Sequence, residues 1–380
     1  MNSYFPAESV KLIFSGNDFF QTLEKHVDRA QEVIHLQTYI FEEDATGRQV
    51  LEALIRAAKR GVKIYLLIDA YGSKGISTQF ISKIQKAGIQ FRFFSPLFSG
   101  ESIYVGRRLH HKIVVIDKFV AIVGGINIGE RYQGGKNVPA WLDYAVMVKG
   151  KGCENLHDLC VAFFEKKRIK KVSKENILFG NENTLPMVRF SRNDWIKGKN
   201  EIYKNVLRAF LHAEKSIVII SSYFLPGYIF RQAIKNARKR GVNVKVILAG
   251  KSDLPFLLYA EKHLYDFLIR NEVEIYEWSS SIMHGKAVLV DEKWVTIGSY
   301  NFNSLSRYWS IELNAEIKDS AFAAVFSEHI NQITLNDCVK IDSHNRLHTS
   351  GLFSKIRNGL SYHLFRIIMK IFFPKKHREK

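Results

Sequence analysis

The chain has 380 residues, of which 46% are hydrophobic and 24% charged, and its formal net charge is +19. This length allows two domains with full cores, since one domain takes roughly 100 to 200 residues, and the composition excludes a largely disordered chain. A positive charge of this size favours partners that carry phosphates, which are either nucleic acid or an anionic bilayer.

The first half of the chain alternates between helical and strand patterns. The N-terminal segment, MNSYFPAESVKLIF, lacks the basic and apolar stretches of a secretory signal. Apolar residues at helical spacing then predict a helix over residues 19–30, a buried strand over 33–41, a second helix over 50–58 and a second strand over 61–69. This order predicts an α/β domain in which helices cover a sheet.

The same order of elements returns after residue 198. A helix through Ile202, Val206 and Phe210 leads to the strand SIVIISSYF, and KRGVNVKVILAG then repeats KRGVKIYLLIDA of the first half. Two halves of similar length indicate an internal duplication. The domains that we expect are a first α/β domain over 1–170, a linker over 171–190, a second α/β domain over 191–340 and a basic tail over 345–380.

The stretch EKKRIKKVSKENILFGNENTLP, which includes most of the expected linker, is rich in lysine and only weakly apolar. A run of charges like this is usually solvated, and contact with lipid or nucleic acid is the alternative interpretation. No uninterrupted apolar run anywhere reaches about 18 residues, so we expect no spanning helix and only peripheral contact with a membrane. The three cysteines form neither a disulfide framework nor a zinc-binding spacing, which predicts a reducing compartment and no metal.

One motif occurs in both halves, with the pattern His-x-Lys-x4-Asp-x6-Gly-(Gly/Ser)-x-Asn. Side chains two apart on a strand point to the same face, so each copy brings a base and a cation to one place. A single copy would be read as a core histidine and a solvated lysine, but a second copy with identical spacing argues against that reading. The motif residues are His110, Lys112, Asp117, Gly124, Gly125 and Asn127, and then His284, Lys286, Asp291, Gly298, Ser299 and Asn301.

The motif residues differ in the chemistry that they offer. The Asp of each copy has the opposite parity to its His, so we assign it to a turn or strand end and not to proton transfer. The small pair, Gly-Gly or Gly-Ser, lets the backbone approach a ligand, and the Asn offers an amide donor. Together, His, Lys and Asn describe a clamp for a phosphate group.

Each histidine also needs a partner that fixes its tautomer. Asp143 and Glu312 are the candidates, because they lie 33 and 28 residues after His110 and His284, each at the start of a further predicted strand. The alternative is that both are ordinary surface carboxylates.

On these motifs the chain resembles the phospholipase D superfamily, whose members carry paired HKD motifs. The resemblance covers about residues 10–335. HHKIVVIDKFVAIVGGINIGERY followed by WLDYAV, and HGKAVLVDEKWVTIGSYNFNSLSRYWSIELN, are most similar to the bacterial cardiolipin synthases. The resemblance implies two α/β/α sandwich halves related by a pseudo-twofold axis, with both motifs in one cleft.

The resemblance also implies an activity, namely phosphatidyl transfer between two phosphatidylglycerols through a phosphohistidine, with release of glycerol and without a metal or cofactor. It implies that His110 is the nucleophile and His284 the acid and base, with the order of the two histidines left open. Lys112, Lys286, Asn127 and Asn301 would neutralise the non-bridging oxygens. The alternatives are a phospholipase D hydrolase, a nucleic-acid phosphodiesterase and a non-catalytic membrane-binding scaffold.

The tail after residue 345 has the pattern of a basic amphipathic helix. Apolar residues recur at 3-and-4 spacing with basic residues on the other side, which is typical of a helix lying in the surface of an anionic membrane. The alternative is a helix docked on the body with a basic outer face. The residues that we expect to contact the membrane are Phe353, Lys355, Arg357, Arg366, Lys370, Phe372, Phe373, Lys375 and Lys376.

These features predict a cytoplasmic protein that is peripheral on the inner face of the cell membrane. Its expected partners are the membrane surface and an anionic phospholipid, phosphatidylglycerol, which we favour over nucleic acid because a nuclease needs no such helix. The sequence leaves the oligomeric state open.

Overall fold

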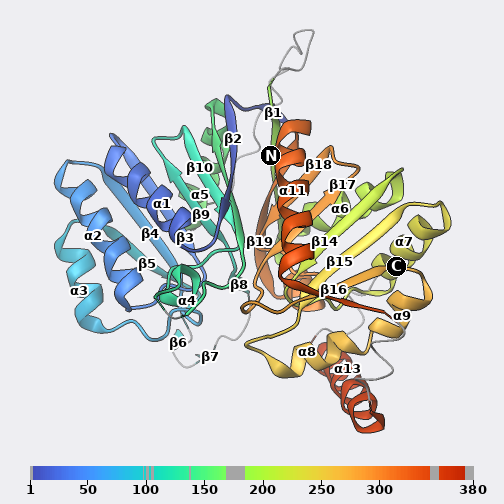
Figure 1. The fold of residues 1–380 in the computed structure, drawn as a ribbon. Coiled ribbons are helices and arrows are strands. Elements are labelled where there is room, and N and C mark those ends of the chain that lie inside the picture. The colour runs from blue at the N-terminus through green and yellow to red at the C-terminus, as the bar shows by residue number, and fades with distance from the viewer. Residues whose placement is uncertain are drawn as a thin grey trace.

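The computed structural model describes residues 3–96, 98–99, 102–103, 107–136, 138–167, 185–342 and 351–372. It contains two α/β halves that lie side by side, with the first half in blue and green and the second in yellow and orange (Figure 1). Each half has one large sheet with helices packed against it, as the alternating patterns predicted.

The sheet of the first half has seven strands in the order β2-β11-β10-β9-β3-β4-β5. Strands β3, β4 and β5 are parallel, and the other pairs are antiparallel. In that order, the bounds are Ser9–Phe14, Tyr144–Lys149, Val120–Gly124, Lys112–Ile116, Val33–Thr38, Lys63–Asp69 and Gln90–Phe94. The helices of this half are α1 (Asn17–Arg29), α2 (Ala45–Lys59), α3 (Thr78–Lys86), α4 (Glu130–Gln133) and α5 (Glu154–Phe164), and a hairpin joins β6 (Phe98–Ser99) to β7 (Ser102–Ile103).

The second half repeats this arrangement in a sheet of eleven strands. Its strands β12-β19-β18-β17-β14-β15-β16 follow the order of the first sheet, which confirms the duplicated α/β fold. Their bounds are Met187–Asp194, Ser310–Lys318, Trp294–Gly298, Lys286–Val290, Ser216–Ser221, Asn243–Ala249 and Glu274–Trp278, and β13 (Lys199–Asn200) and β20 (Cys338–Ile341) pair at its margins. The helices are α6 (Glu201–His212), α7 (Tyr228–Lys239), α8 (Pro255–Lys262), α9 (Tyr265–Arg270), α10 (Ser304–Tyr308) and α11 (Ser320–Asn336).

The two halves share one hydrophobic core. It combines residues from both sheets, such as Val115 and Val146 of the first and Leu289 and Ile297 of the second, with residues of α5 and α11. Two short strands of the first half also join the second sheet, because β1 (Phe5–Pro6) pairs with β12 and β8 (Arg108–Leu109) pairs with β19. The halves are therefore held together by a common core and by backbone pairing.

The expected linker differs from the structure at its C-terminal end. Strand β12 begins at Met187, so residues 187–190 of the expected linker belong to the second sheet. The reason is burial: Val188 and Phe190 pack in the shared core. Residues 168–184, which include most of the expected linker, lie outside the described part of the chain.

The motif carboxylates Asp117 and Asp291 support the sheets at a distance from the histidines. Each lies in a tight turn with positive φ, 51° and 53°. Asp117 accepts hydrogen bonds from the backbone N–H groups of residues 31–33, at 2.8 to 3.0 Å, and Asp291 accepts from those of residues 214–216, at 2.7 to 3.0 Å. Burial raises the pKa of Asp291, but these donors outweigh it and hold the pKa below its usual range. Both side chains anchor the start of a parallel strand.

The tail forms helix α13 (Leu352–Phe372), which packs against α8 at the lower edge of Figure 1. Its inner face, which includes Tyr362 and Phe365, is buried with Leu257 and Leu264. Ile368 and Met369 are half-buried, but other large apolar residues of the helix are exposed, and the exposed fractions of Phe353 and Ile371 reach 88% and 70%. The helix is therefore docked on the body, as the alternative interpretation had it, and its outer surface carries exposed apolar residues together with the basic ones.

The basic residues expected to contact a membrane, Lys355, Arg357, Arg366 and Lys370, are all exposed on α13. Phe372 ends the helix, but its side chain, like Phe373, Lys375 and Lys376, lies outside the described residues. Among the helices that are described, none is both long enough and apolar enough to cross a bilayer.

Candidate active site

The two motif histidines each contact a carboxylate from the opposite half. The distance from His110 Nδ1 to Glu312 Oε2 is 2.8 Å, and that from His284 Nδ1 to Asp143 Oδ2 is 2.6 Å. Both carboxylates are fully buried, which contradicts the reading of them as surface groups. The spacing in the sequence suggested pairing within each half, but the structure pairs the four residues across the halves.

The crossed pairing follows from the backbone at the boundary between the sheets. The segment that ends at His110 runs parallel to β19, and the His110 N–H donates to the carbonyl of Ile311 at 3.0 Å. In the second motif, Leu142 and Met283 form a parallel bridge, and the His284 N–H donates to the carbonyl of Leu142 at 2.8 Å. Each histidine therefore lies beside the residue that precedes the other half's carboxylate.

The partners of the imidazoles also fix their tautomers. The Nδ1 atom of His110 lies near two oxygen acceptors, Glu312 Oε2 and the carbonyl of Ser299 at 3.2 Å. An ionised carboxylate and a carbonyl can only accept, so Nδ1 carries the proton and Nε2 keeps its lone pair. The same argument applies to His284 when Asp143 is ionised. Both Nε2 atoms are thus available as bases or nucleophiles.

The motif lysines are buried beside their histidines. Lys112 Nζ donates to the carbonyl of His110 at 3.0 Å, and Lys286 Nζ donates to the carbonyl of His284. Burial lowers the pKa of Lys112 to about 7 and that of Lys286 to about 8, while the carboxylates of both halves act in the opposite direction. Each ammonium group therefore interacts with charges from both halves, as expected when the two motifs meet.

Burial also controls the charge of the other site groups. It lowers the pKa of His110, and lowers that of His284 well below its usual range, so both imidazoles are neutral in the free protein at neutral pH. For Asp143 burial has the opposite effect and raises the pKa to about 7, against the lowering effect of Lys286. The site is a buried cluster of titratable groups, in which a bound anion would stabilise the protonated forms of the histidines and lysines.

The two motif asparagines have different surroundings. Asn127 accepts from the N–H of Ile40 at 3.1 Å and donates to the hydroxyl of Tyr132 at 2.7 Å. The side-chain oxygen of Asn301 accepts from Ser222 Oγ at 2.9 Å, whereas its amide nitrogen makes no hydrogen bond within the described residues. Asn301 thus keeps a free amide donor, while the amide of Asn127 is partly used inside the first half.

The small motif residues make room for the carboxylates. A Cβ atom on Gly125 would lie 2.2 Å from Asp143 Oδ1, and one on Gly124 would lie 2.4 Å from the carbonyl of Tyr144. Gly298 also has no space for a side chain, since a Cβ atom there would lie 2.3 Å from Asn314 Oδ1. At the position equivalent to Gly125, the hydroxyl of Ser299 donates to Glu312. In each half, a small motif residue therefore lies directly against the carboxylate and leaves room for it.

Several aromatic residues that the sequence did not single out line the imidazoles. The ring of Tyr39 lies 5.0 Å from that of His110, and the rings of Tyr132 and Trp141 lie 5.3 and 6.0 Å from that of His284. Trp141 lies two residues before Asp143 in WLDYAV, and this closeness was the one sequence signal that could have placed it in the site. All three come from the first half, so the site is less symmetric than its motifs.

The second histidine of the HHK sequence belongs to the core. His111 is fully buried, and its Nδ1 lies 3.2 Å from the side-chain oxygen of Gln37. This placement agrees with strand alternation, which puts His110 and Lys112 on one face and His111 on the other. The described part of the chain contains no cluster of three or more His, Cys, Asp or Glu side chains that could hold a metal ion.

The fold and the paired motifs define an enzyme of the phospholipase D superfamily. The family described as "Cardiolipin synthase, PLD-like domain" matches residues 23–141 and 206–334, one segment in each half. The chain therefore belongs to this family of phosphatidyltransferases of the cardiolipin synthase type.

Individual relatives agree with this assignment. The chain is 32% identical to cardiolipin synthase B of Shigella flexneri and of Escherichia coli K12, over 96% of this chain and 89% of each relative. It is 27% identical to a cardiolipin synthase of Clostridium perfringens strain SM101, over 90% of this chain and 73% of that protein. The crystal structure of phosphatidylserine synthase from Haemophilus influenzae shares the fold, with a TM-score of 0.76 and 15% identity over 98% of this chain and 97% of that one.

Proposed function

We propose that this phosphatidyltransferase joins two phosphatidylglycerol molecules into cardiolipin and releases glycerol, with the two histidines as its reacting groups. The observation that carries the proposal is the crossed pairing, in which His110 contacts Glu312 and His284 contacts Asp143, each from the opposite half. Neither half alone supplies a nucleophile together with an acid, so the reaction needs both.

In the first step, His110 Nε2 attacks the phosphorus of one phosphatidylglycerol. The bond from phosphorus to the glycerol oxygen breaks, and the alkoxide takes a proton from His284 Nε2. Burial keeps His284 neutral in the free protein, so it must first gain that proton, and the bound phosphodiester anion together with Asp143 favours the charged form. The Nδ1–H of His110 points at Glu312, which stabilises the positive charge of the phosphohistidine.

In the second step the same groups act in reverse. His284, now neutral, removes the proton from a hydroxyl of a second phosphatidylglycerol, whose oxygen attacks the phosphorus. The bond from phosphorus to His110 breaks and cardiolipin leaves. Lys112, Lys286 and the free amide donor of Asn301 would bind the non-bridging oxygens, where charge accumulates in both transition states. Water in place of the alcohol gives hydrolysis as a side reaction.

Lipid transfer is tested directly against the nucleic-acid alternative. The purified protein is incubated with phosphatidylglycerol vesicles or with single-stranded DNA, both with a chelator present, and the products are separated by mass spectrometry. We expect cardiolipin and glycerol from the vesicles and intact DNA. Cleaved DNA without cardiolipin would replace this proposal with a phosphodiesterase, and vesicle binding without any product would replace it with a scaffold.

The charges of the site predict a narrow pH optimum. Asp143 must be ionised to orient His284, which requires a pH above about 7, whereas the lysines must be protonated, which requires a pH below about 7 for Lys112 and about 8 for Lys286. We therefore expect kcat/KM for phosphatidylglycerol to peak near pH 7 and to fall on both sides. A profile that stays flat from pH 5 to pH 10 would contradict these assignments.

The exposed surface of α13 supports peripheral binding on the inner face of the cell membrane. Its apolar side chains would enter the lipid surface, and its basic residues would add about 1 kcal/mol each near anionic headgroups. Replacing Leu360, Leu364 and Ile367 with Gln is expected to weaken binding to phosphatidylglycerol vesicles by at least about tenfold, since burial of each aliphatic side chain stabilises by up to about 2 kcal/mol. Sedimentation of the protein with vesicles measures this effect.

A matched control tests whether vesicle binding depends on the α13 surface or on exposed apolar residues anywhere on the protein. Leu211, Val325 and Leu335 are also exposed, but they lie on α6 and α11 and not on the tail helix. Their replacement with Gln should leave vesicle binding unchanged. Equal losses in the two triple variants would show that α13 is not the membrane contact.

A further inference from the structure

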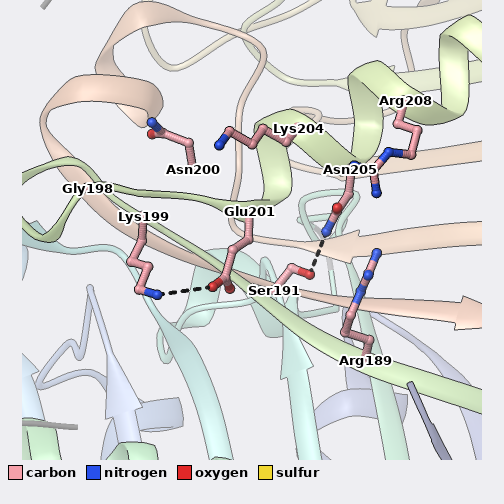
Figure 2. Close-up of a pocket in the computed structure, with 9 residues that line it drawn as sticks. All are labelled: Arg189, Ser191, Gly198, Lys199, Asn200, Glu201, Lys204, Asn205 and Arg208. Atoms are coloured by element: carbon pink, nitrogen blue, oxygen red, sulfur yellow. Dashed lines mark hydrogen bonds and ion pairs between the residues drawn. The ribbon is translucent and has the colours of Figure 1, made fainter. Parts of the chain in front are cut away.

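A basic cavity of about 320 Å³ lies in the second half, outside the duplicated motifs. Strand β12 contributes Arg189 to its wall, the short strand β13 contributes Lys199, and α6 contributes Lys204 and Arg208. Figure 2 shows these side chains, with Lys199 next to Glu201 at one end of the cavity and Arg189 and Arg208 at the other. We call this the α6 cavity.

The cations of the α6 cavity are only partly compensated. Arg189 is bonded to Glu316, a fully buried carboxylate on β19, and Lys199 lies 3.8 Å from Glu201, the single carboxylate in the lining. Lys204 and Arg208 lie one helical turn apart on α6. Neither forms an ion pair within the described residues. The cavity therefore presents two uncompensated cations on one wall.

The corresponding helix of the first half has the opposite character. On α1, Asp18 pairs with Lys11 at 3.1 Å, and Glu24 and Asp28 pair with Arg56 at 2.7 and 2.9 Å. The carboxylates of α1 therefore form ion pairs with cations of neighbouring elements, whereas the α6 cavity has Glu201 as its single carboxylate.

We propose that the α6 cavity binds the phosphate group of a glycerophosphate ester, supplied either by an anionic lipid headgroup or by a soluble ester. Its volume of about 320 Å³ is enough for a phosphate with a glycerol-sized substituent. Ammonium and guanidinium groups together match a phosphate well, because charge-assisted hydrogen bonds are the strongest in proteins. The amide of Asn200, also in the lining, can donate to an ester hydroxyl, whereas that of Asn205 already donates to Ser191 and Glu316.

The proposal is tested by equilibrium dialysis of the full chain with radiolabelled glycerol 3-phosphate. The double variant Lys204→Gln/Arg208→Gln removes the two uncompensated cations from an exposed helix face while keeping residues that favour helix. Lys235→Gln/Lys239→Gln on α7 is the matched control, because it removes the same charge at the same spacing. We expect the α6 variant to lose one equivalent of bound ester, or to bind it roughly tenfold more weakly, while the control binds like the wild type. Equal binding by the wild type and both variants would overturn the proposal.

Competition separates the two sources of the phosphate group. Displacement of the label from the α6 cavity by dihexanoyl phosphatidylglycerol assigns the site to a lipid headgroup, and displacement by inorganic phosphate but not by the lipid assigns it to a soluble ester. Displacement by neither contradicts a phosphate site. Cardiolipin formation from short-chain phosphatidylglycerol is measured in parallel: a wild type that forms no cardiolipin refutes the proposed function, whereas unaltered ester binding in the α6 variant refutes the cavity alone.

Discussion

Replacing His110 with alanine is expected to reduce cardiolipin formation on the order of 10⁴-fold. The substitution removes the atom that would form the covalent bond to phosphorus, and the adjacent His111 cannot replace it, because it is buried on the opposite face of the strand. The measurement is cardiolipin formed by the purified protein from phosphatidylglycerol vesicles, quantified by mass spectrometry.

The control for this variant is His212→Ala, which removes an exposed imidazole at the end of α6. Its activity should match the wild type, and both variants should show the same helical content by circular dichroism. Near-normal activity of His110→Ala would contradict the assignment of the nucleophile.

Glu312→Gln is expected to lower activity by about 10²- to 10⁴-fold, although Glu312 lies in the half opposite to His110. An amide can donate to Nδ1, which would place the imidazole proton on Nε2 and remove the nucleophilic lone pair. The expected size of the loss is the rate enhancement that a correctly oriented base typically contributes. Glu328→Gln, an exposed carboxylate on α11, is the control and should have no effect.

A substrate with a good leaving group tests the crossed pairing itself. Nitrophenolate leaves without a proton, so a nitrophenyl ester of phosphatidic acid requires the nucleophile but not the acid in the first step. We expect Asp143→Asn to release a burst of nitrophenol and then to turn over slowly, because its defect lies at His284. Glu312→Gln should give no burst. The reverse pattern would show that the carboxylates act within their own halves.

Local patterns predicted much of this molecule. The duplication, the order of helices and strands, and the placement of His110 and Lys112 on one face follow from periodicity and spacing, which depend on neighbouring residues. The tail was also predicted as a helix, from its 3-and-4 spacing. These features required no knowledge of how distant segments meet.

The crossed contacts could not be predicted in the same way. His110 and Glu312 are 202 residues apart, and their contact depends on how β8 pairs with β19. A two-residue strand has no periodic signal, so neither β8 nor β1 was visible in the sequence. The same limit applies to α13, whose inner face contains polar Asn358 and Ser361 beside its buried rings. The spacing of apolar residues alone therefore identified the exposed apolar side of α13 and missed the side that packs against α8.

The covalent intermediate gives the most direct test of a site shared by both halves. The wild-type protein is mixed with short-chain phosphatidylglycerol, quenched at alkaline pH within one turnover because phosphohistidine is labile in acid, and digested for peptide mass mapping. We expect the phosphatidyl mass on the peptide that contains His110. Cardiolipin formed at the normal rate with no adduct on either His110 or His284 would contradict the account.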